Sequence, residues 1–131
     1  MGHVVRWVAV LALVVAAPLA WAHEEHEHGN EVSVPEEATL TGEVVDVFCY
    51  LSHGEKGLGE KHAGCAKKCI QGGLPVAIKV GDQLYLASLA DHEPANETLA
   101  DYAGKRVTVW GEIMERDGQR FIAVSRVERA Q

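Results

Sequence analysis

The sequence predicts a small, mainly β domain, in which five short strands form a highly bent barrel with one helix after the first strand and another between the third and fourth. Strand-length segments of alternating apolar and polar residues recur between residues 40 and 128. Glycine-containing turns at residues 81–82 and 116–118 join neighbouring segments as hairpins. Helical spacing followed by a glycine stop occurs in segments 60–71 and 91–104. Many short strands with little helix are typical of a small barrel.

Residues 1–22 have the three parts of a secretory signal peptide. Arg6 is followed by an apolar run from Trp7 to Ala20, and small residues at Ala20 and Ala22 suit a cleavage site. The apolar run is too short for an ordinary membrane span, and no later segment is long enough to be one. We therefore predict cleavage after Ala22, a periplasmic or secreted location, and a mature chain without a membrane span.

Residues 23–37, HEEHEHGNEVSVPEE, are dense in His and Glu and contain little that could be buried. This composition predicts a flexible arm, followed by one domain over residues 38–131. Imidazoles beside a new amino terminus can chelate a transition metal, so His23, His26 and His28 form a weak secondary candidate site. A solvated tail without a specific site explains the same composition, and we favour that interpretation.

The first strand begins near Leu40. Apolar residues alternate from Leu40 to Val44 and then take the opposite parity from Val45 to Cys49. A β-bulge near Val44 and Val45 would explain this switch and would bend the strand. On this interpretation Cys49 closes the strand.

An insertion over residues 49–73, CYLSHGEKGLGEKHAGCAKKCIQGG, contains all three cysteines of the chain. Residues 60–71 have the length and composition of a short helix that ends at the glycine pair 72–73. On that helix His62, Cys65 and Cys69 stand at i, i+3 and i+7 and share one face. Cys49 and His53 precede the helix, and either could fold back over that face.

The remaining chain supplies the other strands and the second helix. Segments 75–80 and 83–88 read as the second and third strands, and segment 91–104 as a helix stopped by Gly104. Segments 105–115 and 119–128 follow as the fourth and fifth strands.

The element order and the closing run GKRVTVWGEIMERDGQRFIAVSRVE resemble the oligonucleotide/oligosaccharide-binding (OB) fold. More narrowly, residues 39–128 resemble small exported bacterial OB-like proteins of uncharacterised function. The run CYLSHGEKGLGEKHAGCAKKCIQGGLP is similar to that of a subgroup with a Cys/His-bearing insertion after the first strand. The resemblance implies a five-stranded OB-like barrel and supplies no chemistry.

The chemistry comes from the insertion. Thiolates and imidazoles together suit Zn(II) or copper, and three cysteines with one histidine can close a tetrahedral zinc centre. The predicted metal ligands are Cys49, Cys65, Cys69 and His62, with His53 as a substitute for His62. An iron–sulfur cluster is a weaker alternative, because a histidine would have to supply its fourth ligand.

Two other interpretations of the cysteines remain open. A disulfide from Cys49 to Cys65 or Cys69 would staple the insertion of a binding or interaction module, which suits an exported chain. It would leave one thiol without a purpose. Thiol–redox exchange is a further alternative, although the chain has no CxxC motif. A Cys65 nucleophile with His62 as base lacks an evident third group, so we predict a binding protein rather than an enzyme.

The charge and composition bear on the partners. The chain has a formal net charge of -7 and few aromatic residues. Acidity disfavours phosphate backbones, and few aromatics leave little for base stacking, so nucleic acid is not an expected partner. The expected partners are a metal ion and another envelope protein.

Overall fold

The computed structural model describes residues 36–131, so the predicted signal peptide and the segment with His23, His26 and His28 lie outside the described residues. The described residues form five strands and three α-helices. In chain order these are β1 (Glu36–Asp46), α1 (Val47–His53), the 3-10 turn η1 (Gly54–Gly57), α2 (Ala63–Gln71), β2 (Val76–Val80), β3 (Gln83–Leu89), α3 (Asn96–Ala100), β4 (Arg106–Arg116) and β5 (Gln119–Arg129). None of these helices is long and apolar enough to cross a bilayer.

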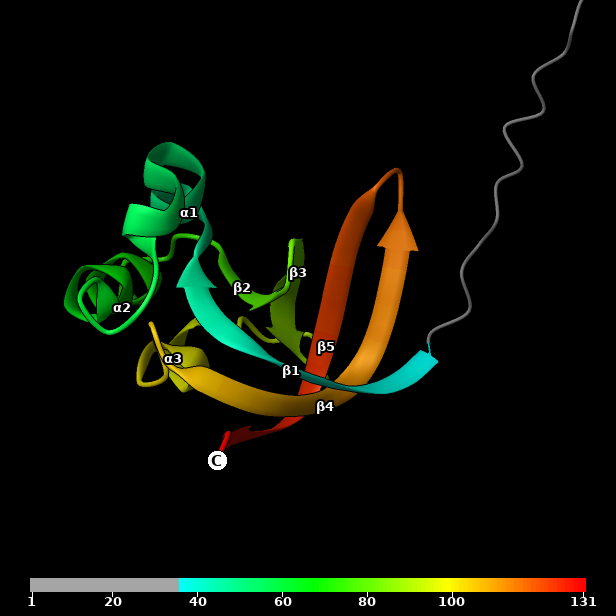
Figure 1. Ribbon diagram of the computed structural model, residues 1–131. Coiled ribbons are helices and arrows are strands. Elements are labelled where there is room, and N and C mark those ends of the chain that lie inside the picture. Colours follow the sequence, from blue (N-terminus) through cyan, green and yellow to red (C-terminus); the bar gives the residue numbers. More distant parts are fainter. Residues whose placement is uncertain (1–35) are drawn as a thin grey trace, which may run out of the picture. The chain divides into compact units, whose positions relative to one another are not determined.

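The five strands close into a barrel in the order β1-β2-β3-β5-β4 (Figure 1). All neighbouring pairs are antiparallel except β3 and β5, which run parallel. The long strands β1 and β4 curve strongly and pair along most of their length. The predicted fold class is confirmed: the domain is a mainly β, five-stranded OB-like barrel with a helix after β1 and another between β3 and β4.

Both predicted hairpin turns are present. Val80 pairs with Gln83 across Gly81-Asp82, and Arg116 pairs with Gln119 across Asp117-Gly118. Asp117 and Gly118 both have positive φ angles, 53° and 77°. This is the backbone of a two-residue turn whose twist matches that of the strands, and Asp-Gly is one of the few dipeptides that adopts it cheaply.

The predicted bulge near Val44 and Val45 is wrong. Residues 43–46 pair with residues 79–76 in unbroken register. Both valines are nevertheless almost fully buried, at 0% and 1% exposure. Val44 packs in the barrel core, whereas Val45 points to the opposite face, and α1 and α2 both contact β1. The change in the alternation of apolar residues at Val45 therefore reflects helices that cover the end of the strand.

Cys49 does not close a strand as predicted. The strand ends at Asp46, whose carboxylate caps a new helix by accepting a hydrogen bond from the Phe48 amide at 3.0 Å. Asp is among the best N-cap residues because its side chain satisfies an amide left free in the first turn. Cys49 therefore lies in the first turn of α1. The predicted helix over residues 60–71 is present as α2, which begins three residues later, at Ala63.

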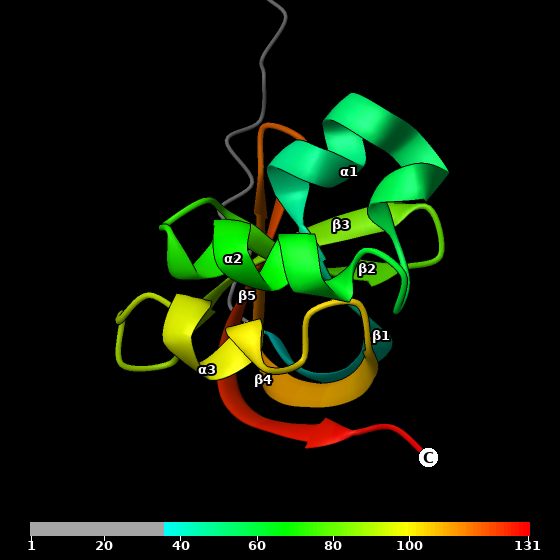
Figure 2. The same cartoon turned by 90° about the vertical axis from the view of Figure 1, so that its left-hand side faces the viewer.

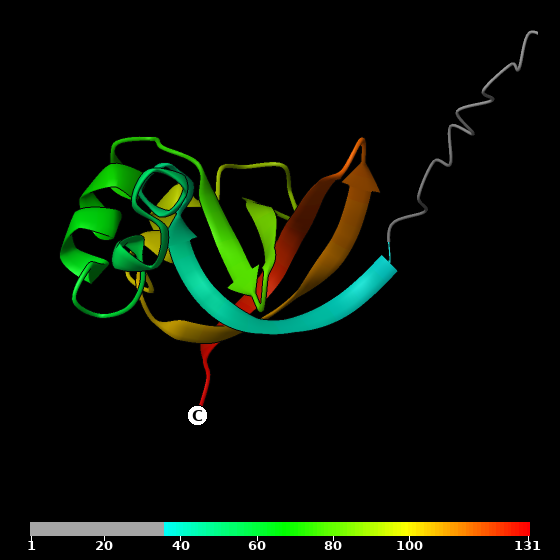
Figure 3. The same cartoon turned by 45° about the horizontal axis from the view of Figure 1, so that its top comes forward.

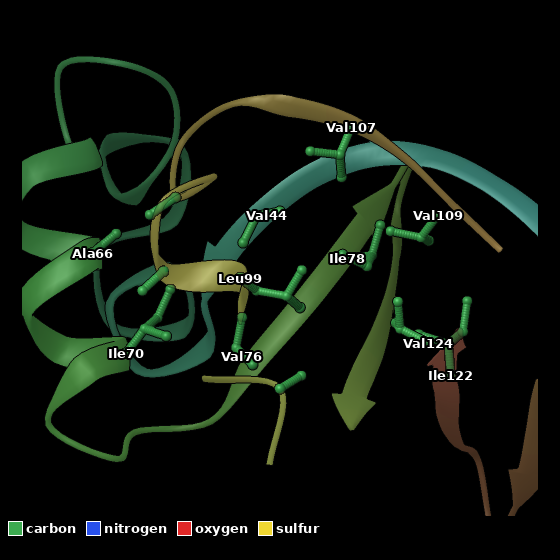
Figure 4. Packing of buried hydrophobic residues seen from close by; sticks show 13 residues of the cluster. Val44, Ala66, Ile70, Val76, Ile78, Leu99, Val107, Val109, Ile122 and Val124 are labelled. Atoms are coloured by element: carbon green, nitrogen blue, oxygen red, sulfur yellow. The ribbon is translucent and has the colours of Figure 1, made fainter. Parts of the chain in front are cut away.

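The helices gather at one end of the barrel (Figures 1 and 2), where α2 and α3 cover the core. Ala66 and Ile70 of α2 and Leu99 of α3 join the barrel residues in one buried cluster (Figure 4). A view with the top of the barrel brought forward shows α1 and α2 side by side beyond the end of β1 (Figure 3). The insertion is therefore anchored to the barrel by apolar packing along α2.

Gly111 allows a close approach of two strands. The register of β4 and β5 shifts between Trp110 and Gly111, where β5 carries one extra residue, Ser125. A Cβ atom at Gly111 would overlap the backbone carbonyl of Ala123. A glycine at this bulge thus lets β4 bend tightly enough to close the barrel.

Asn96 fixes α2 to α3. Its side-chain amide donates hydrogen bonds to the carbonyls of Ile70, at 2.8 Å, and Leu74, at 2.7 Å. Because Asn96→Ala leaves both carbonyls without this donor, we expect a loss of about 1–3 kcal/mol in the free energy of unfolding. Glu97→Ala, at an exposed position of the same helix, is the control. Urea denaturation measures the free energy of unfolding of both variants. Equal values for Asn96→Ala and Glu97→Ala would contradict the role of Asn96 in fixing α2 to α3.

Candidate metal centre

The three cysteines converge from two helices. Cys49 comes from the first turn of α1, and Cys65 and Cys69 stand four residues apart on one face of α2. The three sulfur atoms all lie within 4.8 Å of one another, and all three residues are free thiols. The structure thus brings together the three cysteines that the sequence analysis selected.

The spacing of the sulfur atoms is close to that of a metal site. A zinc–sulfur bond of about 2.3 Å places the sulfurs of a tetrahedral centre about 3.8 Å apart. The observed upper limit of 4.8 Å requires an inward movement of at most about 1 Å, which side-chain rotation supplies. Thiolates are ligands that Zn(II), Cu(I) and related ions prefer.

The cluster is buried on one side and open on the other. Cys49 is 5% exposed, Cys69 is half-buried and Cys65 is exposed. An ion among the three sulfurs would therefore be reached from the Cys65 side.

Asp46 is a residue that the sequence analysis missed. It pairs with Val76 at the end of β1 and is fully buried, at 0% exposure. Its Oδ1 atom accepts the Phe48 amide hydrogen, but Oδ2 has no hydrogen-bond partner among residues 36–131. The carboxylate interacts with the thiols of Cys49 and Cys69. Sequence offered one signal for Asp46, an N-cap residue type three positions before Cys49, but none for its proximity to Cys69.

The Asp46 carboxylate sets the protonation of the two neighbouring thiols. The interaction of its thiol with the Asp46 carboxylate, then burial, then the negative charge of Asp46 raise the pKa of Cys49 from 9.0 to about 12. The same causes in the same order raise the pKa of Cys69. Without a metal ion, both side chains are therefore neutral thiols at neutral pH. A bound cation would displace these protons, so we expect its affinity to rise with pH.

We expect slow alkylation of Cys49 in the metal-free protein. At pH 8 a pKa near 12 leaves far less thiolate than the ordinary value of 9.0. Greater nucleophilicity of a more basic thiolate offsets only part of this loss, so Cys49 should react at least about 10-fold more slowly than an unhindered cysteine. Iodoacetamide labelling followed by peptide mass spectrometry measures the rate at each site. Cys49 alkylation as fast as that of a model peptide would contradict the expectation.

The predicted histidine ligands lie outside the group of three sulfurs. His62 is the N-cap residue of α2, and its Nε2 atom is buried and lacks a hydrogen-bond partner among residues 36–131. His53 ends α1 and is exposed. Neither belongs to the set of ligand atoms that all lie within 4.8 Å of one another. A histidine as fourth ligand stays a prediction.

Two contacts hold the insertion in place around the cluster. The Gly59 amide donates a hydrogen bond to Oε1 of Glu43 on β1, at 2.6 Å, and so fixes the loop between the helices. Lys67 of α2 forms an ion pair with Asp101, also at 2.6 Å. With the apolar anchors of α2, these contacts restrict the backbone that carries the cysteines.

Comparison of the chain with protein-family models, with curated proteins and with solved structures finds no significant match.

Proposed function

We propose that this protein is an exported metal-binding protein that holds one transition-metal ion, zinc or copper, at Cys49, Cys65 and Cys69. The observation that carries the proposal is the convergence of three free thiols from two helices within 4.8 Å. A histidine, His62 or His53, remains a candidate to complete the ligand set. The buried Nε2 atom of His62, which lacks a partner among the described residues, supports His62 over His53.

Two observations favour metal handling over a purely structural centre. Cys65 is exposed, so a bound ion is accessible to an incoming ligand from a recipient protein. The barrel also has a continuous apolar core that includes Ile70 and Leu99 and does not depend on the cysteines. Structural zinc sites are usual where a domain lacks such a core.

The location and the family are part of the proposal. The signal-like segment at residues 1–22 supports export to the periplasm or beyond. The OB-like barrel with its cysteine-bearing insertion supports membership in the exported OB-like group that the sequence resembles. Another envelope protein would then be the donor or recipient of the ion.

The second candidate function is a disulfide-stapled or thiol-redox protein. It draws on the same observation, because sulfurs within 4.8 Å can form a bond after a small movement, and export favours oxidation. This candidate predicts one free thiol and no tightly held ion.

Purification of the mature protein, followed by elemental mass spectrometry and a thiol count, separates the two functions. We expect one ion per chain and three thiols that react after chelation. A Cys65→Ser protein is the matched comparison, because it removes the exposed ligand and leaves the buried Cys49 in place. Metal content that is unchanged in Cys65→Ser would end the metal proposal.

Removal of the metal should leave the barrel folded. Because the core does not include the cysteine cluster, we expect the chelated protein to keep its β circular dichroism spectrum and a cooperative thermal transition. Chelation should lower the free energy of unfolding only by the contribution of metal binding, which is about 4 kcal/mol when free metal is 1,000-fold above Kd. The Tm should fall accordingly. Loss of the spectrum on chelation would instead indicate a structural centre.

A further inference from the structure

We propose that Asp46, in place of a histidine, is the fourth ligand of this centre and makes it selective for a divalent ion of the zinc class over Cu(I). The inference rests on the proposed metal-binding function and names the class of ion.

The first support is the burial of a carboxylate with a free oxygen. Asp46 is fully buried, and its Oδ2 atom lacks a hydrogen-bond partner within residues 36–131. A buried polar group without a partner is costly, and a buried charge is normally paired or bound to a metal. No lysine or arginine is paired with Asp46 among the described residues. The free oxygen therefore lacks a cation where one would be expected.

The second support is the position of Asp46 beside the cysteines. Asp46 directly precedes the helix that carries Cys49, and its carboxylate interacts with the thiols of both Cys49 and Cys69. It thus lies beside the two less exposed cysteines, whereas Cys65 is exposed. The set of atoms within 4.8 Å of one another does not include the carboxylate, so coordination requires the ligands to close around the ion.

The third support is ligand chemistry. Zn(II) accepts a carboxylate oxygen at about 2.0–2.2 Å beside thiolates in a tetrahedral site. Cu(I) is softer and is selected by thiolate and thioether ligands, so a carboxylate adds little to its binding. Three thiolates alone would serve either ion, and the carboxylate is the part of the site that distinguishes them.

Asp46 is also the N-cap residue of α1, and a test of its role as a ligand must leave this cap intact. Its Oδ1 atom caps α1 through the Phe48 amide. Asn is as good a helix cap as Asp, so Asp46→Asn keeps the cap and the shape while it removes the anionic ligand. Asp82→Asn is the matched control, because Asp82 is exposed in the turn between β2 and β3.

The test is a pair of competition titrations on the reduced mature protein, with a chromophoric chelator for Zn(II) and bicinchoninate for Cu(I). We expect Asp46→Asn to weaken Zn(II) binding by at least about 10-fold and not to weaken Cu(I) binding. Asp82→Asn should weaken neither. Substitution with Co(II) adds a second readout, since the visible absorption bands should shift in Asp46→Asn as the ligand set changes.

Equal weakening of Zn(II) and Cu(I), or Zn(II) affinity equal to that of the wild type, would overturn the role of Asp46. If the wild-type protein itself binds neither ion, the proposed function fails as well, which is a distinct result. Should Asp46→Asn fold poorly, Asp46→Ser supplies a shorter cap without a carboxylate. Thermal unfolding of each metal-free variant confirms that folded proteins are compared.

Discussion

Cys49→Ser is expected to weaken metal binding by more than about 100-fold, because loss of a direct ligand should exceed the 10- to 100-fold cost of losing a supporting contact. Cys49 is the buried member of the cluster and the only cysteine of α1, so no neighbouring thiol can replace it. Serine nearly preserves the volume of cysteine and tests the sulfur rather than the packing. Competition titration with a chromophoric chelator measures the change.

Ser52→Ala is a control for this substitution, because Ser52 lies on the same short helix and is exposed. Its affinity should match that of the wild type. Retention of wild-type affinity by Cys49→Ser would show that the ion is not held among the three sulfurs.

Ile70→Ala should lower the free energy of unfolding by about 2–5 kcal/mol, the usual cost of emptying a fully buried aliphatic position. Ile70 is 0% exposed and belongs to the core cluster, although it lies on the helix that carries Cys65 and Cys69. The cavity would open where α2 meets the barrel. Guanidinium denaturation of the metal-free protein measures the loss.

Leu51→Ala provides the matched aliphatic control, since Leu51 is 70% exposed on α1. A surface substitution of this kind should change stability by less than about 0.5 kcal/mol. If Ile70→Ala cost no more than Leu51→Ala, the packing of α2 on the barrel end would be wrong.

The barrel could be predicted because its signals are local. Alternation in the strands, the Asp117-Gly118 turn and the glycine pair after α2 depend on neighbouring residues alone. The error at Val44 and Val45 arose because the burial of these valines depends on residues that are distant in the sequence. Helices from the insertion cover the outer face at the end of β1, and no pattern within the strand reports a distant cover.

The candidate site could be predicted only in part for the same reason. Cys65 and Cys69 share a helix, so their proximity follows from helical geometry. Cys49 was placed at the end of a strand, although Asp46 begins a helix three residues earlier. Asp46 itself escaped notice, because an aspartate at the end of a strand is ordinary until the fold buries it beside two thiols.

Native mass spectrometry of the mature protein, purified without added metal or reductant, shows whether the three cysteines hold an ion. We expect a chain that carries one ion and shows the full mass of three reduced cysteines after chelation. A metal-free chain whose mass shows one disulfide among Cys49, Cys65 and Cys69 would contradict it.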